Sequence, residues 1–309
     1  MKIIKPKFWD KNYLTLFSLI LLPFTLIYKL IFFFNRKTKD EKKFSIPIIC
    51  IGNIYIGGTG KTPLSIKTFD ILRDLKKNPV IIKKNYKNQR DEALLLKSYC
   101  KTILSKNRTE GITEAINKKY DCVILDDGYQ DFEIYKNLNI ISFNAMQKIG
   151  NGHTLPAGPL RESLKSLKRC QLILINGEKD LNFETKLKRY NPKLKFFYYS
   201  YRAANITNFK NKKLIAFAGI GNPKNFFDFL KFNHLNIVKE IEYPDHYEYS
   251  QNELDTLANL EKQYNASLIT TEKDYLRINK IFRKRVSFLP IKVEFKEQNY
   301  ANEIKKFIL

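Results

Sequence analysis

A glycine-rich turn that follows an apolar segment constrains the fold of this chain more than any other feature of its sequence. Residues 48–51 are apolar, and the turn that follows them contains Gly57-Gly58-Thr59-Gly60-Lys61-Thr62. Glycines let successive backbone N–H groups wrap an anionic oxygen, because no side chain blocks the approach. Lys61 can then reach the β- and γ-phosphates of a nucleotide, and the Thr62 hydroxyl can ligate Mg²⁺. We therefore predict a phosphate-binding loop before a helix over residues 64–75. The usual first glycine is replaced by Tyr55, and an ordinary strand-to-helix turn is the alternative interpretation.

A second apolar segment ends in two aspartates. Residues 120–125 predict a buried strand that is followed by Asp126 and Asp127. A carboxylate at the carboxyl end of a strand beside the phosphate loop can hold Mg²⁺ directly or through water. Such residues also cap ordinary turns, but the loop upstream favours the metal-binding interpretation. Because further strands and helices alternate, the predicted fold class is α/β: a P-loop NTPase-like parallel sheet flanked by helices.

The N-terminal region carries a long apolar run over residues 13–34, with lysines before it and basic residues after it. The run is about as long as a spanning helix of roughly 20 residues, but Pro23 and Lys29 interrupt it. A kinked helix that lies in one leaflet fits at least as well as a full span, and a buried core helix is the alternative. A cleaved signal peptide is disfavoured because no small-residue cleavage site follows.

Composition limits the class of protein. The 309 residues contain 44% apolar residues, enough for a sizeable core and about two domains. The net charge of +24 suggests a polyanionic partner such as nucleic acid or anionic lipid headgroups, although a lysine-rich composition alone could account for it. The four cysteines form no Cys-x-x-Cys pair, which indicates buried thiols in a reducing compartment and no zinc site.

Two further polar segments are candidates for the site. The Pro- and Gly-rich segment 151–160 leads to Arg161, which suits a phosphate, and Glu162, which suits a metal or a sugar hydroxyl. A second strand-helix unit begins after residue 211 and contains His246 next to Asp245, a pair that could take a proton from an attacking hydroxyl. Residues 271–274 form a polar cluster where another predicted strand ends.

In their order along the chain, these motifs resemble those of the tetraacyldisaccharide 4'-kinases, the lipid A kinases of Gram-negative bacteria. The matching segments are 52–63, 91–96, 122–130, 151–163, 218–223, 244–249 and 270–274. The resemblance implies transfer of the ATP γ-phosphate to the 4'-hydroxyl of a tetraacylated glucosamine disaccharide 1-phosphate, by a phosphotransferase with an alcohol acceptor. It also implies a position at the cytoplasmic face of the bacterial inner membrane, ATP and Mg²⁺ as cofactors, and a glycolipid and the membrane surface as partners, with no nucleic acid or protein partner.

The resemblance also implies residue roles. Lys61 would contact the nucleotide phosphates, and Asp91 with His246 would activate the sugar hydroxyl. The remaining expected residues are the loop residues Gly57, Gly58, Thr59, Gly60 and Thr62, the metal candidates Thr62, Asp126, Asp127 and Glu162, and Glu92, Gln130 and Arg161 in the vicinity of the site.

The chain departs from the family pattern in the segment before Asp91. Lys83 to Lys87 replace the usual Ser-Arg-Gly-Tyr-Gly, and only three residues separate them from Asp91. Ala93 replaces a proline, and Asp131 stands where histidine is common. We expect three regions: a membrane-associated helical segment over 1–44, a P-loop kinase domain over 45–210, and a smaller C-terminal α/β domain over 211–309 that closes over the active site. The alternative functions are a membrane-tethered P-loop ATPase acting in assembly or on nucleic acid, and a non-catalytic membrane adaptor.

Overall fold

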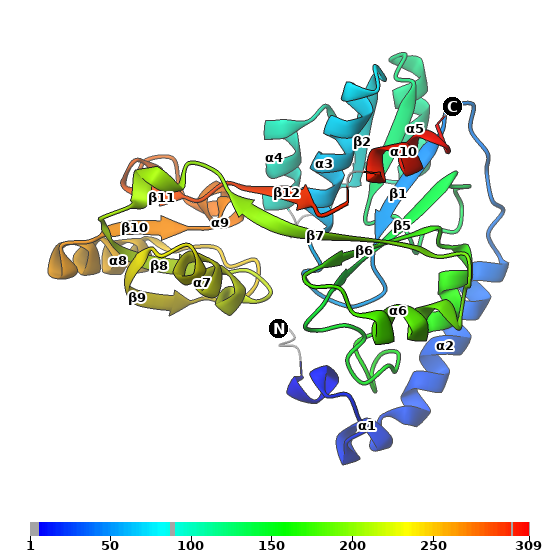
Figure 1. Ribbon diagram of the computed structural model, residues 1–309, viewed down its shortest axis with the longest axis horizontal. Coiled ribbons are helices and arrows are strands. Elements are labelled where there is room, and N and C mark those ends of the chain that lie inside the picture. The colour runs from blue at the N-terminus through cyan, green and yellow to red at the C-terminus, as the bar shows by residue number, and fades with distance from the viewer. Residues whose placement is uncertain (1–5, 87–89, 298, 309) are drawn as a thin grey trace. The chain divides into compact units, whose positions relative to one another are not determined.

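The chain folds into two compact units that are each assembled from separate segments. The computed structural model describes residues 6–86, 90–297 and 299–308. Unit 1 comprises Met1–Lys84, Lys101–Ser200 and Val293–Leu309, and unit 2 comprises Asn85–Cys100 and Tyr201–Lys292. The chain therefore passes between the units four times. Figure 1 labels the helices and strands and colours them by residue number.

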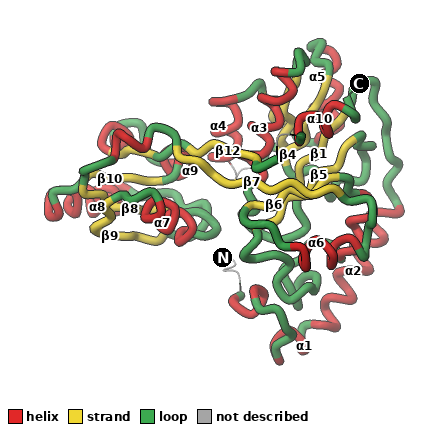
Figure 2. Tube along the Cα trace, viewed as in Figure 1, coloured by secondary structure: helices red, strands yellow, loops and turns green. Residues whose placement is uncertain are grey.

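Unit 1 is built on an eight-stranded sheet with the order β12-β7-β6-β5-β1-β4-β2-β3 (Figure 2). The strands are β1 Ile48–Gly52, β2 Pro79–Lys84, β3 Thr102–Ser105, β4 Cys122–Asp126, β5 Leu138–Asn144, β6 Leu172–Asn176, β7 Lys195–Ala203 and β12 Ile291–Phe295. Neighbouring strands from β7 to β3 are parallel. All residues of β1 and β4 are buried, as expected for a parallel sheet that is covered on both faces.

Helices cover this sheet. They are α3 Lys61–Asp74, α5 Arg108–Asn117, α6 Leu181–Lys188 and α10 Tyr300–Lys305. The apolar side chains of β1, β2, β4, β5 and β6 join in one continuous core. Because α3 follows β1 directly and packs against β1, β2 and β4, the loop between β1 and α3 lies at the carboxyl ends of the central strands. This edge is where ligands of open α/β sheets bind.

The N-terminal apolar run forms two helices, α1 Leu16–Ile20 and α2 Leu22–Lys37. Pro23 lies in the first turn of α2, where its missing N–H leaves no partner unsatisfied, so the predicted kink is a break between two helices. One face of α2 docks on unit 1: the Thr25 hydroxyl donates to the Thr154 carbonyl, and the Tyr28 hydroxyl donates to the Arg161 carbonyl. Within the described residues, none of the helices is both long and apolar enough to span a bilayer.

Unit 2 contains a four-stranded parallel sheet with the order β11-β10-β8-β9. Its strands are β8 Lys213–Ala218, β9 Asn236–Glu242, β10 Ser267–Thr270 and β11 Val286–Phe288, and its helices are α4 Arg90–Tyr99, α7 Pro223–Phe232, α8 Gln251–Tyr264 and α9 Glu272–Arg277. Successive residues of β8 point to opposite faces: Leu214 and Ala216 join the cluster that includes α7, whereas Ile215 and Phe217 join the cluster that includes α8.

The observed units differ in three segments from the expected division at residues 210 and 211. The segment 85–100 belongs to unit 2, the segment 293–309 belongs to unit 1, and the chain enters unit 2 at Tyr201. The reason is tertiary packing, since α4 contacts α9, whose residues come about 180 positions later in the chain. Local sequence patterns carry no information about such a contact.

Candidate active site

The phosphate loop connects β1 to α3, and its backbone adopts conformations that glycine permits. Gly57 has φ +106° and Gly60 has φ +79°, in the region that favours glycine. A Cβ placed on Gly57 or Gly58 would meet no atom within 4 Å, so open space lies in front of this backbone. Lys61 and Thr62 are the first two residues of α3. The loop therefore leaves the room that an anionic oxygen needs at the N-terminus of a helix.

Two buried polar side chains hold the loop in shape. Asn53 Nδ2 donates to the Tyr55 carbonyl at 2.6 Å and to Thr59 Oγ1 at 2.9 Å. Ser142, in the neighbouring strand β5, donates its hydroxyl to the Thr59 carbonyl. Asn53 lies in a motif that matches the family, but the sequence suggested no role for either residue. The contact of Ser142 is visible only in the fold.

Asp127 faces the loop lysine and brings three predicted residues together. Its Oδ2 lies 3.6 Å from Lys61 Nζ, and its two carboxylate oxygens lie 3.1 Å and 3.2 Å from Arg161 Nη1. Burial acts to raise the pKa of Asp127, but the charges of Lys61 and Arg161 outweigh burial and hold the pKa below its usual value. The carboxylate is therefore ionised beside the phosphate loop.

Asp126 is buried more deeply and has different partners. Its Oδ2 accepts from Lys83 Nζ at 2.8 Å, its Oδ1 accepts from Ser65 Oγ at 2.9 Å, and the Lys83 and Asp126 side chains are 3% and 1% exposed. Arg108 donates to the carbonyl of Asp127 at 2.6 Å, which fixes the turn between the two aspartates. Lys83 and Arg108 had no predicted role. The site thus contains more cations than the sequence motifs indicate.

Glu162 is held by two side chains. Arg169 Nη2 donates to both of its carboxylate oxygens at 3.0 Å and 2.9 Å, and Gln130 Nε2 donates to Oε1 at 3.0 Å. Arg169 also lies over the rings of Tyr129 and Phe132, with its Cζ 4.4 Å and 4.9 Å from the two centroids. Gln130 and Glu162 were both predicted near the site and are in contact. Arg169 was missed because no local pattern distinguishes it from a surface arginine.

The donor atoms at the loop fit Mg²⁺ bound together with a nucleotide. Across residues 6–86, 90–297 and 299–308, no group of three His, Cys, Asp or Glu side chains is arranged to hold a metal ion. Mg²⁺, however, is usually held by one or two protein groups, with substrate phosphates and water as its other ligands. The Thr62 hydroxyl, which follows Lys61 in α3, and the Asp127 carboxylate are oxygen donors of the preferred kind. All three carboxylates have cationic partners, but the Asp127 side chain is 21% exposed, whereas those of Asp126 and Glu162 are 1% and 4% exposed.

Unit 2 contains the second group of predicted residues. Asp91, at the start of α4, accepts from His246 Nδ1 at 3.2 Å through Oδ1 and from Arg277 Nη2 at 2.6 Å through Oδ2. Burial acts to raise the pKa of Asp91, but the His246 hydrogen bond and the Arg277 charge outweigh it and lower the pKa to about 2. The hydrogen bond to Asp91 raises the pKa of His246 against the effect of burial. The predicted pair of Asp91 and His246 is thus formed in the structure.

The neighbouring residue Glu92 has a structural contact in the same unit. Its Oε1 accepts from Lys273 Nζ of α9 at 2.7 Å. A second bond between the same helices joins the Tyr99 hydroxyl to Glu272 Oε1 at 2.8 Å. Glu92 therefore helps to hold α4 on α9 next to the pair of Asp91 and His246.

A basic cavity of about 230 Å³ lies in unit 1 between α2 and the segment that contains Arg161 and Glu162. Aromatic side chains of α2 line it together with cationic side chains from both segments. These cationic residues are Lys29, Arg36, Arg161, Lys165 and Arg169. Its chemistry suits an anionic group that carries apolar substituents.

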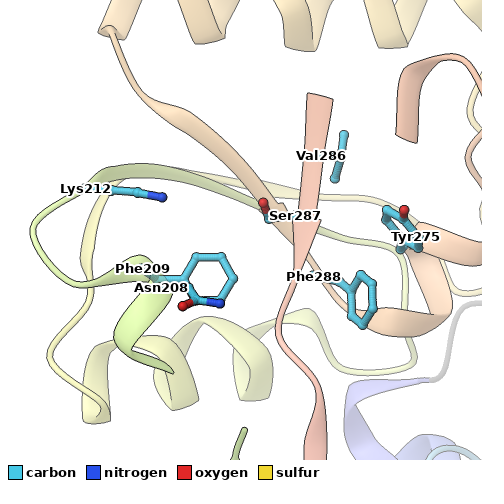
Figure 3. Close-up of a pocket in the computed structure, with 7 residues that line it drawn as sticks. All are labelled: Asn208, Phe209, Lys212, Tyr275, Val286, Ser287 and Phe288. Atoms are coloured by element: carbon cyan, nitrogen blue, oxygen red, sulfur yellow. The ribbon is translucent and has the colours of Figure 1, made fainter. Parts of the chain in front are cut away.

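A larger cavity of about 530 Å³ lies in unit 2 and contains none of the predicted residues (Figure 3). Its lining includes Lys212 and Asn208 from the segment before β8 and Phe288 from β11, with Tyr275 from α9. None of these side chains belongs to the polar clusters described above. We assign this cavity no part in the candidate site.

Unit 1 defines the class of the protein. A parallel sheet with a glycine loop after a central strand, an ammonium at the start of the next helix and a carboxylate facing that ammonium are the features of a P-loop nucleotide-binding α/β protein. The predicted fold class is therefore confirmed.

Comparison with known proteins gives the family. The family model described as tetraacyldisaccharide-1-P 4'-kinase (LpxK) matches residues 17–309. The tetraacyldisaccharide 4'-kinase of Pelagibacter ubique is 41% identical over 313 residues, which cover 99% of this chain and 98% of that protein. The enzyme of the same name from Rickettsia akari is 33% identical and covers 98% of this chain and 97% of its own length. The chain belongs to the tetraacyldisaccharide 4'-kinase family, as its motifs predicted.

A solved structure supports the fold. The crystal structure described as the "apo" form of LpxK from Aquifex aeolicus in complex with ATP aligns with a TM-score of 0.75. The alignment covers 95% of this chain and all of that one, at 24% sequence identity. The predicted enzyme class, a phosphotransferase that acts on a hydroxyl group, is the class of the named relatives.

Proposed function

We propose that this chain transfers the γ-phosphoryl group of ATP to the 4'-hydroxyl of a tetraacylated glucosamine disaccharide 1-phosphate, a step of lipid A biosynthesis. Family membership supports the substrate class. The observation that carries the chemistry is the cluster of Lys61, Asp127 and Arg161 at the mouth of the glycine loop. Such a cluster offers two cations to a triphosphate and one carboxylate to its metal ion.

In this proposal the loop backbone binds the phosphates. Lys61 stabilises the negative charge on the phosphoryl group that is transferred. Thr62 and Asp127 would hold Mg²⁺, which neutralises phosphate charge when it is bound. Arg161 is paired with Asp127 in the structure and would offer a second cation to the same phosphates. Asp126, with Lys83 and Ser65 as partners, supports the turn that presents Asp127.

We assign activation of the acceptor hydroxyl to Asp91 and His246. A sugar hydroxyl is a weak nucleophile at neutral pH, so a positioned base that takes its proton accelerates attack on phosphorus. The hydroxyl has to meet the γ-phosphate and the base at the same time. Loss of transfer with unchanged nucleotide binding in an Asp91 variant is the expected mark of this role.

We further propose that the protein acts at the cytoplasmic face of the bacterial inner membrane, with α1 and α2 in one leaflet. Large apolar side chains of both helices are exposed, among them Leu16, Phe17, Leu26, Leu30 and Phe34 at 58–72%. An exposed apolar surface of this kind is typical of a membrane or protein contact. The basic cavity beside α2 suits the 1-phosphate that the acceptor already carries.

The direct test uses γ-labelled ATP, Mg²⁺ and the disaccharide 1-phosphate in detergent micelles, with label scored at the 4' position. We expect labelled lipid from the wild-type protein and a loss of about 10²-fold or more for Lys61→Ala, since a charge-stabilising donor is removed. Lys118→Ala removes an exposed lysine directly after α5 and serves as the control. ATP consumption without labelled lipid would contradict the proposal and favour an ATPase, and binding to nucleic acid that falls steeply with salt would point to the nucleic-acid alternative.

A further inference from the structure

Arg277 connects the Asp91 carboxylate to the interior of unit 2. Its Nη2 donates to Asp91 Oδ2 at 2.6 Å, and its Nη1 donates to Asp274 Oδ1 at 2.9 Å and to the Gly219 carbonyl at 2.6 Å. The side chain is 7% exposed. The guanidinium of Arg277, which lies in α9, is therefore bonded both to the start of α4 and to the turn after β8.

Asp274 is itself fixed, so the Arg277 guanidinium has a rigid support. The Asp274 side chain is fully buried and accepts from the Gly219 N–H at 3.1 Å, the Tyr249 hydroxyl at 2.9 Å and the Thr271 hydroxyl at 2.6 Å. An arginine held by a carboxylate and a carbonyl loses little freedom when it binds a second carboxylate. The position of Asp91 is thus fixed by its hydrogen bond to Arg277, whose guanidinium is itself held by Asp274 and Gly219.

The two oxygens of Asp91 are both in use. Oδ2 belongs to Arg277, and Oδ1 faces His246 Nδ1. Because an ionised carboxylate only accepts hydrogen bonds, Nδ1 must carry the proton of the neutral imidazole, and Nε2 is then the basic nitrogen. The side chain of His246 is 27% exposed, whereas that of Asp91 is 3% exposed. An incoming hydroxyl can approach the imidazole more readily than the carboxylate.

We propose that Arg277 is the positioning residue of the pair that activates the acceptor: by holding the second oxygen of Asp91, it fixes the carboxylate in the orientation in which Oδ1 meets His246 Nδ1. This inference rests on the proposed kinase function, in which Asp91 and His246 activate the acceptor hydroxyl.

The proposed transfer forms one bond to phosphorus and breaks another. The 4'-hydroxyl oxygen forms a bond to the γ-phosphorus, the bond between that phosphorus and the β–γ bridging oxygen breaks, and ADP takes the electron pair of the broken bond. The hydroxyl proton moves to His246 Nε2. The imidazolium that results is neutralised by the Asp91 carboxylate on Nδ1, and it later releases the proton to solvent.

The charges around the pair set the direction of the pH effect. Lys273 and Arg277 of α9 lower the pKa of Asp91. The hydrogen bond to Asp91 and the charge of Asp245 raise the pKa of His246, and Arg277 lowers it. Removal of the Arg277 charge therefore raises the pKa of both groups while the hydrogen bond between Asp91 and His246 is kept. His246 must be neutral to accept a proton. A higher His246 pKa in a variant without Arg277 therefore moves the acid limb of its kcat/KM profile to higher pH.

The experiment compares Arg277→Gln and Arg277→Lys with the wild-type protein in the lipid kinase assay between pH 5 and 9. We expect Arg277→Gln to lower kcat about 10²-fold with an unchanged KM for ATP, because the base is misplaced. We also expect the acid limb to move upward by about one pH unit. Arg277→Lys keeps the charge, so the acid limb of its kcat/KM profile should lie close to that of the wild-type protein. Tyr99→Phe removes a different α4–α9 hydrogen bond and serves as the control for helix docking.

Histidine NMR gives a readout that does not depend on turnover. The chain has three histidines, so the His246 resonance can be assigned with His246→Gln and titrated in the wild-type and Arg277→Gln proteins. An upward shift of the His246 pKa in Arg277→Gln is expected. An unchanged titration and acid limb would overturn the proposal, as would a Tyr99→Phe variant with the same defects as Arg277→Gln. Absence of lipid phosphorylation in the wild-type protein would instead refute the proposed function, whatever the titration shows.

Discussion

Asp126 and Asp127 are adjacent in the sequence, yet their carboxylates have different partners and different exposures. Asp127 faces Lys61 and Arg161 at the mouth of the loop, whereas Asp126 is buried against Lys83 and Ser65. A buried carboxylate that keeps its charge needs such a partner, since desolvation otherwise costs several kcal/mol. At the scale of single residues, the cation on β2 is therefore part of the phosphate site even though no motif contains it.

We predict that Lys83→Met destabilises the protein by about 3–5 kcal/mol, because Asp126 is left buried without a cation. Urea denaturation measures the free energy of unfolding. The matched control is Lys39→Met, which breaks an exposed Lys39–Glu133 pair of 2.5 Å and should cost less than about 1 kcal/mol. Similar losses in the two variants would show that burial of the pair is unimportant. The double variant Lys83→Met with Asp126→Asn should recover part of the loss.

At the scale of elements, α2 shows how one helix divides its faces between two environments. Thr25 and Tyr28 lie on the docked face, and their hydroxyls bond the segment that carries Arg161. Ile27, Leu30 and Ile31 are 54–58% exposed. The helical period separates these sets, since residues three and four positions apart share a face. The apolar run in the sequence is thus explained by docking on one side and by an exposed apolar surface on the other.

We expect the triple variant Ile27→Ser, Leu30→Ser and Ile31→Ser to lose at least about tenfold in partitioning to phospholipid vesicles, because each buried apolar side chain contributes roughly 1.5–3 kcal/mol to insertion. Vesicle sedimentation measures the partitioning. The free energy of unfolding in the absence of lipid should change little, since these three side chains are more than half exposed. Undiminished partitioning would argue that α2 does not contact the membrane. Thr25→Val, on the docked face, is the control that should affect stability and spare partitioning.

For the whole molecule, the charge excess of 55 basic over 31 acidic residues is a property that no single site explains. Part of it lies in the basic cavity and around the phosphate loop. A charge of +24 attracts anionic surfaces over a distance set by salt. In the proposed function, this charge would favour association of the protein with the anionic surface that holds its glycolipid substrate.

The corresponding prediction is that binding to vesicles with anionic lipid weakens steeply as ionic strength rises from about 0.1 M to about 1 M, where the Debye length falls from about 10 Å to about 3 Å. Binding to zwitterionic vesicles should be weaker and nearly independent of salt, because only apolar insertion remains. Flotation assays at both salt concentrations measure the difference. Equal binding to the two kinds of vesicle would contradict an electrostatic contribution.

The sequence by itself determined the phosphate loop, the strand before Asp126 and Asp127, and the family. These features are local: glycine conformation, apolar runs and fixed motif spacing are written in consecutive residues. Only the tertiary structure decided that α4 belongs to unit 2, that Lys83 neutralises Asp126, and that Arg277 holds Asp91. The contact between residues 91 and 277 depends on how a buried guanidinium is satisfied once distant segments pack together, and no local pattern records that requirement.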